Sequence, residues 1–243
     1  MAASTEVKIY SKPKKVCKAV AREIRKMTEG SPRPRFDIAL SGGNTPKKLF
    51  KNLAKKHKDN IPWEHIHFWW GDERCVTPTS DESNFKMAND FLFSHVPVPS
   101  KNIHRIKGEN PPVEEAKRYA AEMNKNLNHR SEVPVFDLVL LGLGDDGHTA
   151  SIFPDQLEIF EESRTCVATK HPLTGQNRIT LTGKVLNNAN RIFFMVTGEN
   201  KSMRLAEIMN NEEAARLLPA YYIEPKNGSL IWFADEPAAS KIT

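Results

Sequence analysis

The stretch Phe136-Asp137-Leu138-Val139-Leu140-Leu141-Gly142 is the most strand-like part of this 243-residue chain. It is a short apolar run that ends at a glycine, a pattern typical of a strand buried on both faces. The glycine-rich segment Gly142-Leu143-Gly144-Asp145-Asp146-Gly147-His148 follows without a break. The sequence therefore predicts a buried strand that leads directly into a tight turn carrying charged side chains.

Strand-like and helix-like segments alternate on both sides of this stretch. Strands are expected at 36–41, 66–70, 136–142, 191–197 and 229–234, and helices at 45–58, 81–95, 114–127 and 200–210. This alternation predicts an α/β fold, with a mostly parallel sheet covered by helices on both faces. Because no repeat or low-complexity linker interrupts it, residues 1–243 are expected to form a single domain. Parallel strands bind ligands at their carboxyl ends, so the loops after the strands are the candidate site.

The composition is that of an ordinary globular protein, with 39% hydrophobic and 27% charged residues. No apolar run is long enough to span a bilayer, and residues 1–5 contain no long apolar leader. We therefore expect a cytoplasmic protein that does not bind a membrane. The three cysteines are widely spaced and are expected to be reduced thiols. His65 and His67 have no third partner, so no metal site is expected.

The net charge of +5 raises the question of a nucleic-acid partner. The lysines are spread over helix-like stretches such as 12–18 and 47–58, a pattern that indicates solvated basic faces. We therefore expect no nucleic-acid partner. A basic balance also suits a small anionic substrate, because it raises the local concentration of phosphate esters. The sequence leaves the oligomeric state open, and a monomer is favoured.

The segment Ser41-Gly42-Gly43-Asn44-Thr45-Pro46 joins an expected strand to an expected helix. Its two glycines allow backbone N–H groups to approach a ligand closely. Thr45 is a candidate helix cap, and Pro46 suits the first helical position. A helix N-terminus with free N–H donors is a phosphate site, which is the function that we expect for this loop.

Three further segments carry charge where the fold would place ligands. Asp72-Glu73-Arg74 follows the strand that ends at Trp70, and an arginine there can bind a phosphate or stabilise an oxyanion. Lys201 lies in the first turn of an expected helix, where a bound anion would offset its unfavourable interaction with the helix dipole. Arg178 precedes a β-prone run and is a further candidate anion ligand.

The turn before His148 matches the G-x-G-x-x-G spacing of dinucleotide-binding loops. Asp145 and Asp146 argue against that function, because two carboxylates would repel a pyrophosphate. The residues about twenty positions further on also lack a strand that ends in an acid. The remaining interpretation is a turn that presents His148 at the start of a short helical turn over 149–151. A helix N-terminus favours neutral imidazole, which can act as a general base.

Six motifs, in this order along residues 41–201, resemble the 6-phosphogluconolactonase family: Ser41-Gly42-Gly43-Asn44-Thr45-Pro46, Gly71-Asp72-Glu73-Arg74, Ser83-Asn84, Gly144-Asp145-Asp146-Gly147-His148-Thr149-Ala150-Ser151-Ile152-Phe153-Pro154, Arg178-Ile179-Thr180-Leu181-Thr182 and Gly198-Glu199-Asn200-Lys201. One departure is Asp155, which stands where the family usually has glycine. It affects the expected shape of the loop more than the chemistry.

The resemblance implies a Rossmann-like α/β fold shared with glucosamine-6-phosphate deaminases and ribose-5-phosphate isomerases. It also implies hydrolysis of 6-phosphogluconolactone to 6-phosphogluconate in the pentose phosphate pathway, without a cofactor. The implied roles are catalysis for His148, a place in the pocket for Arg74, and phosphate binding for the 41–45 loop, Arg178 and Lys201.

A mechanism consistent with these residues uses His148 as the base that activates water. Arg74 or backbone N–H groups would then stabilise the oxyanion. Asp72 or Glu73 could orient the imidazole, and the sequence does not choose between them. Covalent catalysis by Cys75 or Ser151 is less well supported, because neither has an evident adjacent base.

Two other functions share much of this pattern. A glucosamine-6-phosphate deaminase would have a glutamate at the position of Phe153 and a tyrosine at that of Arg74, so it is disfavoured. A non-enzymatic sugar-phosphate sensor would keep the phosphate loop but would need no base like His148.

Overall fold

The computed structural model describes residues 4–29 and 35–243, so residues 1–3 of the segment inspected for a leader lie outside the described part. The helices and strands are β1 (Ser4–Tyr10), α1 (Pro13–Glu29), β2 (Phe36–Leu40), α2 (Asn44–Lys56), β3 (Ile66–Trp70), β4 (Asp72–Arg74), α3 (Asn84–Phe91), α4 (Pro112–Asn126), β5 (Asn128–Arg130), β6 (Val133–Val135), β7 (Leu138–Leu141), β8 (Cys166–Lys170), β9 (Asn177–Leu181), α5 (Gly183–Leu186), β10 (Arg191–Val196), α6 (Ser202–Met209), β11 (Ser229–Asp235) and α7 (Glu236–Ala239).

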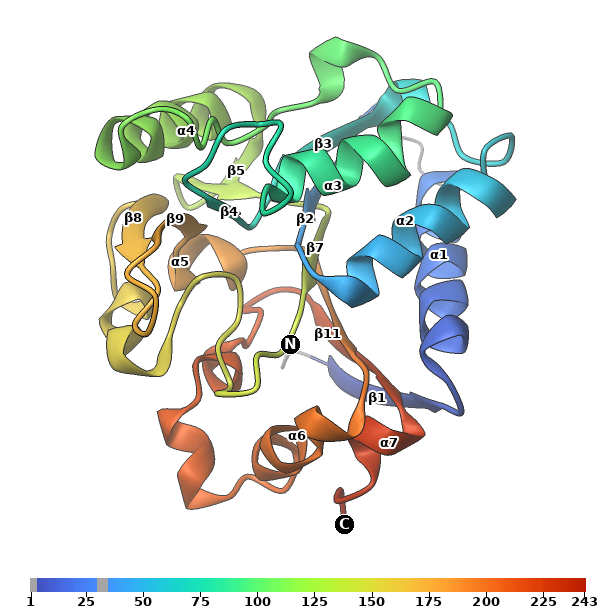
Figure 1. Ribbon diagram of the computed structural model, residues 1–243, viewed down its shortest axis with the longest axis vertical. Helices are drawn as coiled ribbons and strands as arrows, with labels where there is room; N and C mark the ends of the chain where they lie inside the picture. The colour runs from blue at the N-terminus through green and yellow to red at the C-terminus, as the bar shows by residue number, and fades with distance from the viewer. Residues whose placement is uncertain (1–3, 30–34) are drawn as a thin grey trace.

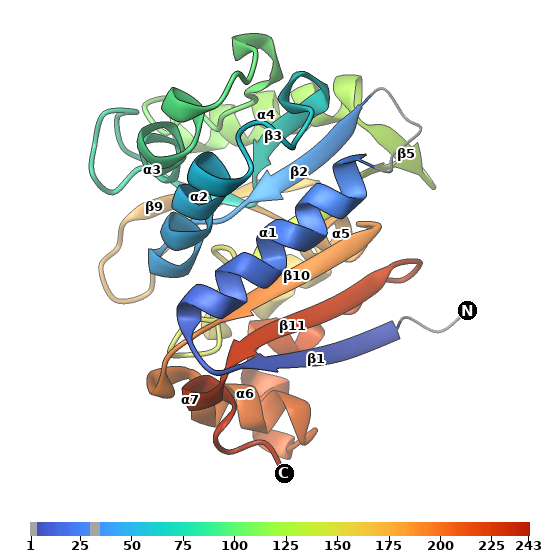
Figure 2. The ribbon, with the colours of Figure 1, turned by 90° about the vertical axis from the view of Figure 1, so that its right-hand side faces the viewer.

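A six-stranded sheet in the order β1-β11-β10-β7-β2-β3 forms the centre of the fold, and all of its strand pairs are parallel. Helices α1 and α2 cover one face, and α1 lies across β10 and β11 (Figure 2). Helices α4 and α5 lie on the opposite face together with a small antiparallel sheet, β4-β9-β8 (Figure 1). The predicted α/β architecture is therefore confirmed.

Strand β7 lies in the interior of the sheet, between β10 and β2. The side chains of Leu138, Val139, Leu140 and Leu141 are all 0% exposed. This burial on both faces explains why the strand reads as a continuous apolar run rather than an alternating one. Its carboxyl end opens into the 142–148 turn, at the same edge as the ends of β2 and β10.

Three predicted elements differ in extent or type. The helix expected at 81–95 is the shorter α3, because the hydroxyl of Ser83 accepts a hydrogen bond from the backbone N–H of Lys86 and so caps a helix that begins at Asn84. The helix expected at 200–210 begins at Ser202, after a short 3₁₀ turn. Residues 72–74, expected as a loop, form β4, which pairs antiparallel with β9.

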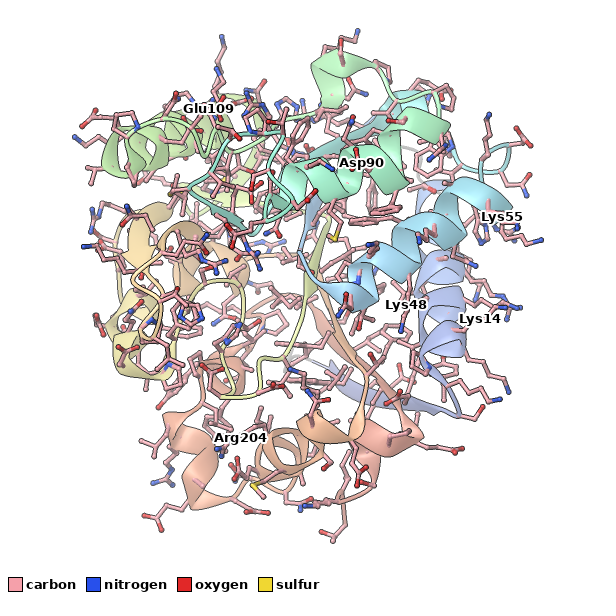
Figure 3. All side chains as sticks on the ribbon, in the orientation of Figure 1. Lys14, Lys48, Lys55, Asp90, Glu109 and Arg204 are labelled. Carbon is pink, nitrogen blue, oxygen red and sulfur yellow. The ribbon has the colours of Figure 1, made fainter. Side chains whose placement is uncertain are left out.

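Many of the basic residues lie on the outer surface of α1 and α2. Lys14, Lys48 and Lys55 are exposed and extend away from the sheet (Figure 3). This placement agrees with the predicted solvated basic faces. Within the described ranges, no helix combines the length and the apolar character needed to cross a membrane.

Candidate active site

A cleft of about 470 Å³ lies where the carboxyl ends of β2, β3, β7 and β10 meet. This is the edge at which parallel strands bind ligands. Of the predicted site residues, the cleft is lined by Ser41, Gly42, Gly43, Asp72, Arg74, His148 and Lys201. The structure thus brings together side chains from four strand ends that are far apart in the chain.

His148 is held by Asp146, two residues earlier in the same turn. Asp146 Oδ1 lies 2.6 Å from His148 Nδ1 and also accepts the backbone N–H of His148, at 3.1 Å. Burial alone would raise the pKa of Asp146, but these hydrogen bonds and the charge of the imidazole lower it to about 2. The ionised carboxylate favours the tautomer with the proton on Nδ1. Nε2 is then left free to accept a proton.

Gly144 makes room for this pair. A Cβ atom at position 144 would lie 2.2 Å from His148 Nδ1 and 2.6 Å from Asp146 Oδ1. Both approaches are too close for any side chain, so the imidazole and the carboxylate occupy the space that a larger residue would fill. The second glycine of the predicted turn is therefore needed for the position of His148.

The short helical turn expected after His148 does not form. Thr149 and Ile152 form an antiparallel bridge instead, and Ala150 has a positive φ of 49°. The hydroxyl of Thr149 donates to the carbonyl oxygen of Gly142 at 3.0 Å, which closes the turn onto the end of β7. The predicted helix dipole is thus absent, and the nearby charge that acts on His148 is the Asp146 carboxylate.

Neither carboxylate that was expected to orient the imidazole does so. Asp72 Oδ2 accepts a hydrogen bond from the hydroxyl of Ser151 at 2.6 Å, so Asp72 holds the turn that follows His148 rather than the ring. Glu73 is buried and accepts hydrogen bonds from the backbone N–H groups of Asn84 and Phe85, at 2.7 and 2.8 Å. It therefore anchors the N-terminus of α3. Burial raises the pKa of Glu73, while these N–H donors oppose the rise.

Arg74 and Arg178 are directly opposed in the β4–β9 pair. Arg178 is only 8% exposed and does not line the cleft surface itself. Burial, together with the neighbouring Arg74, lowers the pKa of Arg178. The Nε atoms of both residues are buried, and neither has a hydrogen-bond partner among the described residues. Two adjacent cations with unused donors favour binding of an anion.

The 41–45 loop reaches the cleft through its first three residues. Helix α2 begins at Asn44 after Gly43, and no side chain of the described chain caps it. The hydroxyl of Thr45, the expected cap, instead lies 2.8 Å from the hydroxyl of Thr197. This hydrogen bond joins α2 to the end of β10. The hydroxyl of buried Ser41 lacks a partner among the described residues. These donors remain free for a ligand.

Lys201 lines the cleft from the turn before α6. Its ammonium group pairs with the carboxylate of Asp145, which also accepts a hydrogen bond from the side chain of Asn200 at 2.7 Å. The hydrogen bond from Lys201, despite partial burial, lowers the pKa of Asp145. The anion expected near Lys201 is therefore supplied by the protein in this structure.

Sequence reasoning assigned no role to three residues that line the cleft, although Asn84 belongs to one of the six motifs. Asn84 lines it from the start of α3, and His171 and Leu173 line it from the hairpin between β8 and β9. The hairpin residues come near His148 only because β9 pairs with β4, a contact that no local pattern encodes. Phe153, buried at 2% exposure, packs against the rings of both His148 and His171.

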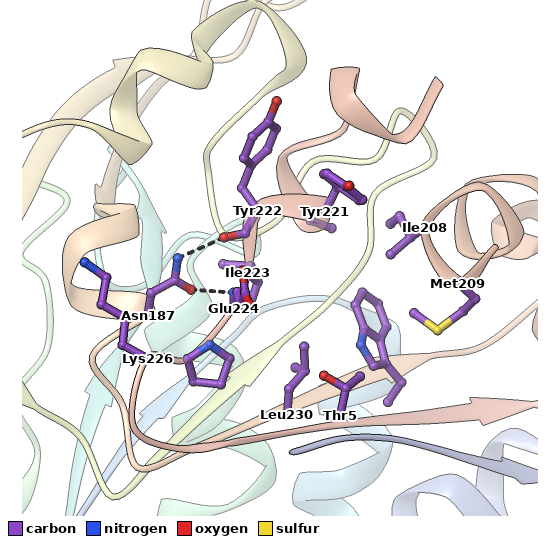
Figure 4. A pocket seen from close by; sticks show the side chains of 13 residues that line it. Thr5, Asn187, Ile208, Met209, Tyr221, Tyr222, Ile223, Glu224, Lys226 and Leu230 are labelled. Atoms are coloured by element: carbon purple, nitrogen blue, oxygen red, sulfur yellow. Dashed lines mark hydrogen bonds between the residues drawn. The ribbon is translucent and has the colours of Figure 1, made fainter. Parts of the chain in front are cut away.

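A larger cavity, of about 740 Å³, lies away from this edge, near the beginnings of β1 and β11 (Figure 4). Its Asn187 side chain is bonded to backbone groups of Tyr222 and Glu224, both at 2.8 Å. The groups capable of proton transfer and anion binding described above lie in the smaller cleft. The cleft, rather than the larger cavity, is therefore the candidate active site.

Fold and cleft together define a class of α/β protein in which a histidine–aspartate pair and arginine side chains meet at the carboxyl edge of a parallel sheet. The family model for glucosamine-6-phosphate isomerases/6-phosphogluconolactonase matches residues 11–232. The chain belongs to this family.

Individual relatives agree with this assignment. A 6-phosphogluconolactonase of Aggregatibacter actinomycetemcomitans is 45% identical over 83% of this chain and 85% of its own. One from Treponema pallidum is 39% identical over 80% of each chain. The crystal structure of a 6-phosphogluconolactonase from Thermotoga maritima superposes with a TM-score of 0.83 at 31% identity, over 96% of this chain and all of the other.

Proposed function

We propose that this protein is a cytoplasmic enzyme that hydrolyses 6-phosphogluconolactone to 6-phosphogluconate, a step of the pentose phosphate pathway. The observation that carries the proposal is the Asp146–His148 pair, with its 2.6 Å contact, in a cleft that also contains Arg74. The family membership and the named relatives support the same reaction.

In the proposed mechanism, His148 Nε2 takes a proton from water, and the resulting hydroxide attacks the lactone carbonyl carbon. Asp146 keeps the imidazole in the required tautomer and stabilises the imidazolium that forms. His148 then returns the proton to the ring oxygen as the carbon–oxygen bond breaks. A positioned general base of this kind contributes about 100- to 10,000-fold to the rate.

The phosphate of the substrate would bind to the unused donors at the edge of the cleft. Arg178 and Arg74 supply adjacent positive charge, and the free N–H groups at the start of α2 supply further donors. Lys201 would exchange part of its pairing with Asp145 for the phosphate. Each of these groups is held in place by secondary structure rather than by a long flexible loop.

Phe153 argues for lactone hydrolysis over deamination within the family. It stands where the deaminase pattern has glutamate, and it packs against His148 with ring centres 5.0 Å apart. An apolar ring cannot accept or donate the proton that ring opening of an amino sugar requires. A sugar-phosphate sensor would not need the Asp146–His148 pair.

The decisive experiment is a coupled assay with freshly prepared 6-phosphogluconolactone, from which the spontaneous hydrolysis rate is subtracted. We expect enzyme-dependent formation of 6-phosphogluconate and no ammonia release from glucosamine 6-phosphate. Enzyme-dependent ammonia would overturn the choice between the two activities. The absence of any acceleration of lactone hydrolysis would reject the proposed function.

A further inference from the structure

His171 lies in the cleft on the hairpin that joins β8 to β9. Its backbone N–H donates to the carbonyl oxygen of Gln176, and its own carbonyl accepts from Gly175, both at 2.9 Å. The side chain of Gln176 donates to Glu82 at 3.2 Å, which ties the hairpin to the segment before α3. The backbone of His171 is therefore fixed at the base of the hairpin.

The same hairpin fixes the tautomer of the His171 ring. Nδ1 accepts hydrogen bonds from the backbone N–H groups of Leu173 and Thr174, at 3.2 and 3.4 Å. A ring nitrogen that accepts carries no proton, so in the neutral ring the proton is on Nε2. A proton on Nδ1 would face the N–H groups of Leu173 and Thr174 and would repel both. His171 is thus held as a neutral ring with one donor, Nε2–H.

The charges around His171 act in the same direction. Partial burial, followed by the nearby Arg178 and His148, lowers its pKa, and Arg74 adds to this. Asp146 acts in the opposite direction, but it is already paired with His148. His171 therefore stays uncharged near neutral pH, and its hydrogen-bond donor does not depend on a proton from solution.

Phe153 packs against both histidines. Its ring lies 5.0 Å from the ring of His148 and 4.9 Å from that of His171, centre to centre. Both histidines line the same cleft. A ligand bound in this cleft can therefore contact both imidazole rings. Arg74, the earlier candidate for the oxyanion, already donates to the carbonyl oxygen of Glu82 at 3.0 Å.

We propose that His171 is a catalytic residue that donates its Nε2–H to the lactone carbonyl oxygen while negative charge develops there. This inference rests on the proposed lactonase function. As hydroxide bonds to the carbonyl carbon, the carbonyl π electrons move onto oxygen, and the His171 donor stabilises that charge. When the carbon–oxygen ring bond breaks, the carbonyl re-forms and the ring oxygen takes the proton from His148. The proton of His171 remains on its nitrogen throughout.

The kinetic test compares a variant that lacks the donor with one that restores it. His171→Leu should lower kcat about 100- to 1,000-fold with little change in KM, the usual effect of losing one oxyanion donor. His171→Gln places an amide N–H at similar reach and should recover most of that loss. The matched control is His129→Leu, the same change at an exposed residue of β5, which should leave kcat unchanged.

The outcomes separate this inference from the proposed function. If the wild type accelerates lactone hydrolysis but a folded His171→Leu variant keeps its kcat, the role of His171 is wrong. If the wild type does not accelerate hydrolysis, the proposed function itself is wrong.

A second measurement tests His171 without relying on turnover. Nitrogen NMR of ¹⁵N-histidine-labelled protein, assigned with the His171→Gln variant, should show a neutral His171 with its proton on Nε2 at pH 7. Addition of 6-phosphogluconate should shift the Nε2 signal more than the Nδ1 signal. A charged ring, or a neutral ring with its proton on Nδ1, would overturn the proposal.

Discussion

Asp146 reaches His148 because the two residues lie in one glycine-rich turn that folds back on itself. Gly147 has a positive φ of 85°, and its N–H donates to the carbonyl oxygen of Gly144 at 3.1 Å. The carboxylate therefore contacts Nδ1 through a local turn, and no distant element is needed to orient the ring. At the scale of single residues, this contact and the free Nε2 are what make His148 a candidate base.

The first prediction concerns His148 itself. His148→Asn keeps a polar side chain but cannot accept and return a proton, so kcat should fall about 100- to 10,000-fold. KM should change little, because the phosphate contacts remain. Steady-state kinetics on a variant with wild-type circular dichroism would check this. Near-normal kcat would make His148 structural and would require another group to activate the water.

The second prediction concerns Gly144. Gly144→Ala would place a methyl group 2.2 Å from His148 Nδ1 and force the ring away from Asp146. A displacement of about 1 Å in an active site can lower the rate about 100-fold, so kcat should fall by that order. Gly142→Ala is the matched control, because a Cβ there meets no atom within 4 Å. Equal activity of the two variants would contradict the role assigned to Gly144.

At the scale of elements, strand β3 and the chain before α4 are joined by a histidine pair. His67 Nδ1 lies 2.9 Å from His104 Nε2, and Nδ1 of His104 lies 2.8 Å from a carboxylate oxygen of Glu122. Burial and the nearby Arg35 lower the pKa of His67 from 6.5 to about 4, with Asp37 opposing and His104 and Lys101 adding to the shift. His67 is therefore harder to protonate in the folded protein than in the unfolded chain.

This linkage gives the third prediction. Above pH 6.5 His67 is neutral in both states and its contribution to stability is fully present. As the pH falls from 6.5 toward 4, only the unfolded chain binds the proton, so the free energy of unfolding should decrease. Because the ring is partly exposed, solvent screening limits the effect to about 1 kcal/mol.

Denaturant unfolding at pH 7.5 and pH 5 would measure this difference. His67→Gln should reduce the pH dependence, whereas the control His65→Gln, at a half-exposed position, should not. An identical pH dependence in the His67 variant and the wild type would contradict the linkage.

At the scale of the whole molecule, the anion-binding groups come together only in the folded chain. Those of the 41–45 loop, β4 and the turn before α6 line one cleft, and Arg178 of β9 lies opposite Arg74 in the small sheet. A ligand that binds this arrangement and not the unfolded chain must stabilise the fold by mass action.

The fourth prediction follows from this coupling. 6-Phosphogluconate at about 100 times its Kd should stabilise the protein by about 2.7 kcal/mol, which raises Tm by about 5 to 10 °C. Arg178→Ala and Lys201→Ala should reduce this ligand-induced shift and raise KM for the lactone. Lys226→Ala, at the larger cavity, should leave both unchanged. Calorimetry with and without ligand is the measurement. An undiminished shift in both the Arg178 and the Lys201 variant would remove these residues from the phosphate site.

Much of the fold follows from local pattern, because helices and strands each bury apolar side chains at a characteristic spacing along the chain. The apolar runs at 36–40, 66–70 and 138–141 are parallel strands, and the helical period after Pro46 is α2. The start of α3 is harder to predict, because it depends on which groups accept hydrogen bonds from the first N–H donors of the helix. The Ser83 cap and the Glu73 anchor provide these acceptors, and only one of them lies beside the helix in sequence.

By itself the sequence determined the α/β class, the strand that ends at Leu141, and the turn that presents His148, since each depends on residues close together in the chain. Only the tertiary structure decided that Asp72 holds Ser151, that Arg74 lies opposite Arg178, and that His171 enters the cleft. These contacts join residues from different strands and loops, and they depend on strand order and register. Hydrophobic periodicity indicates which faces are buried, but it does not encode which buried faces meet.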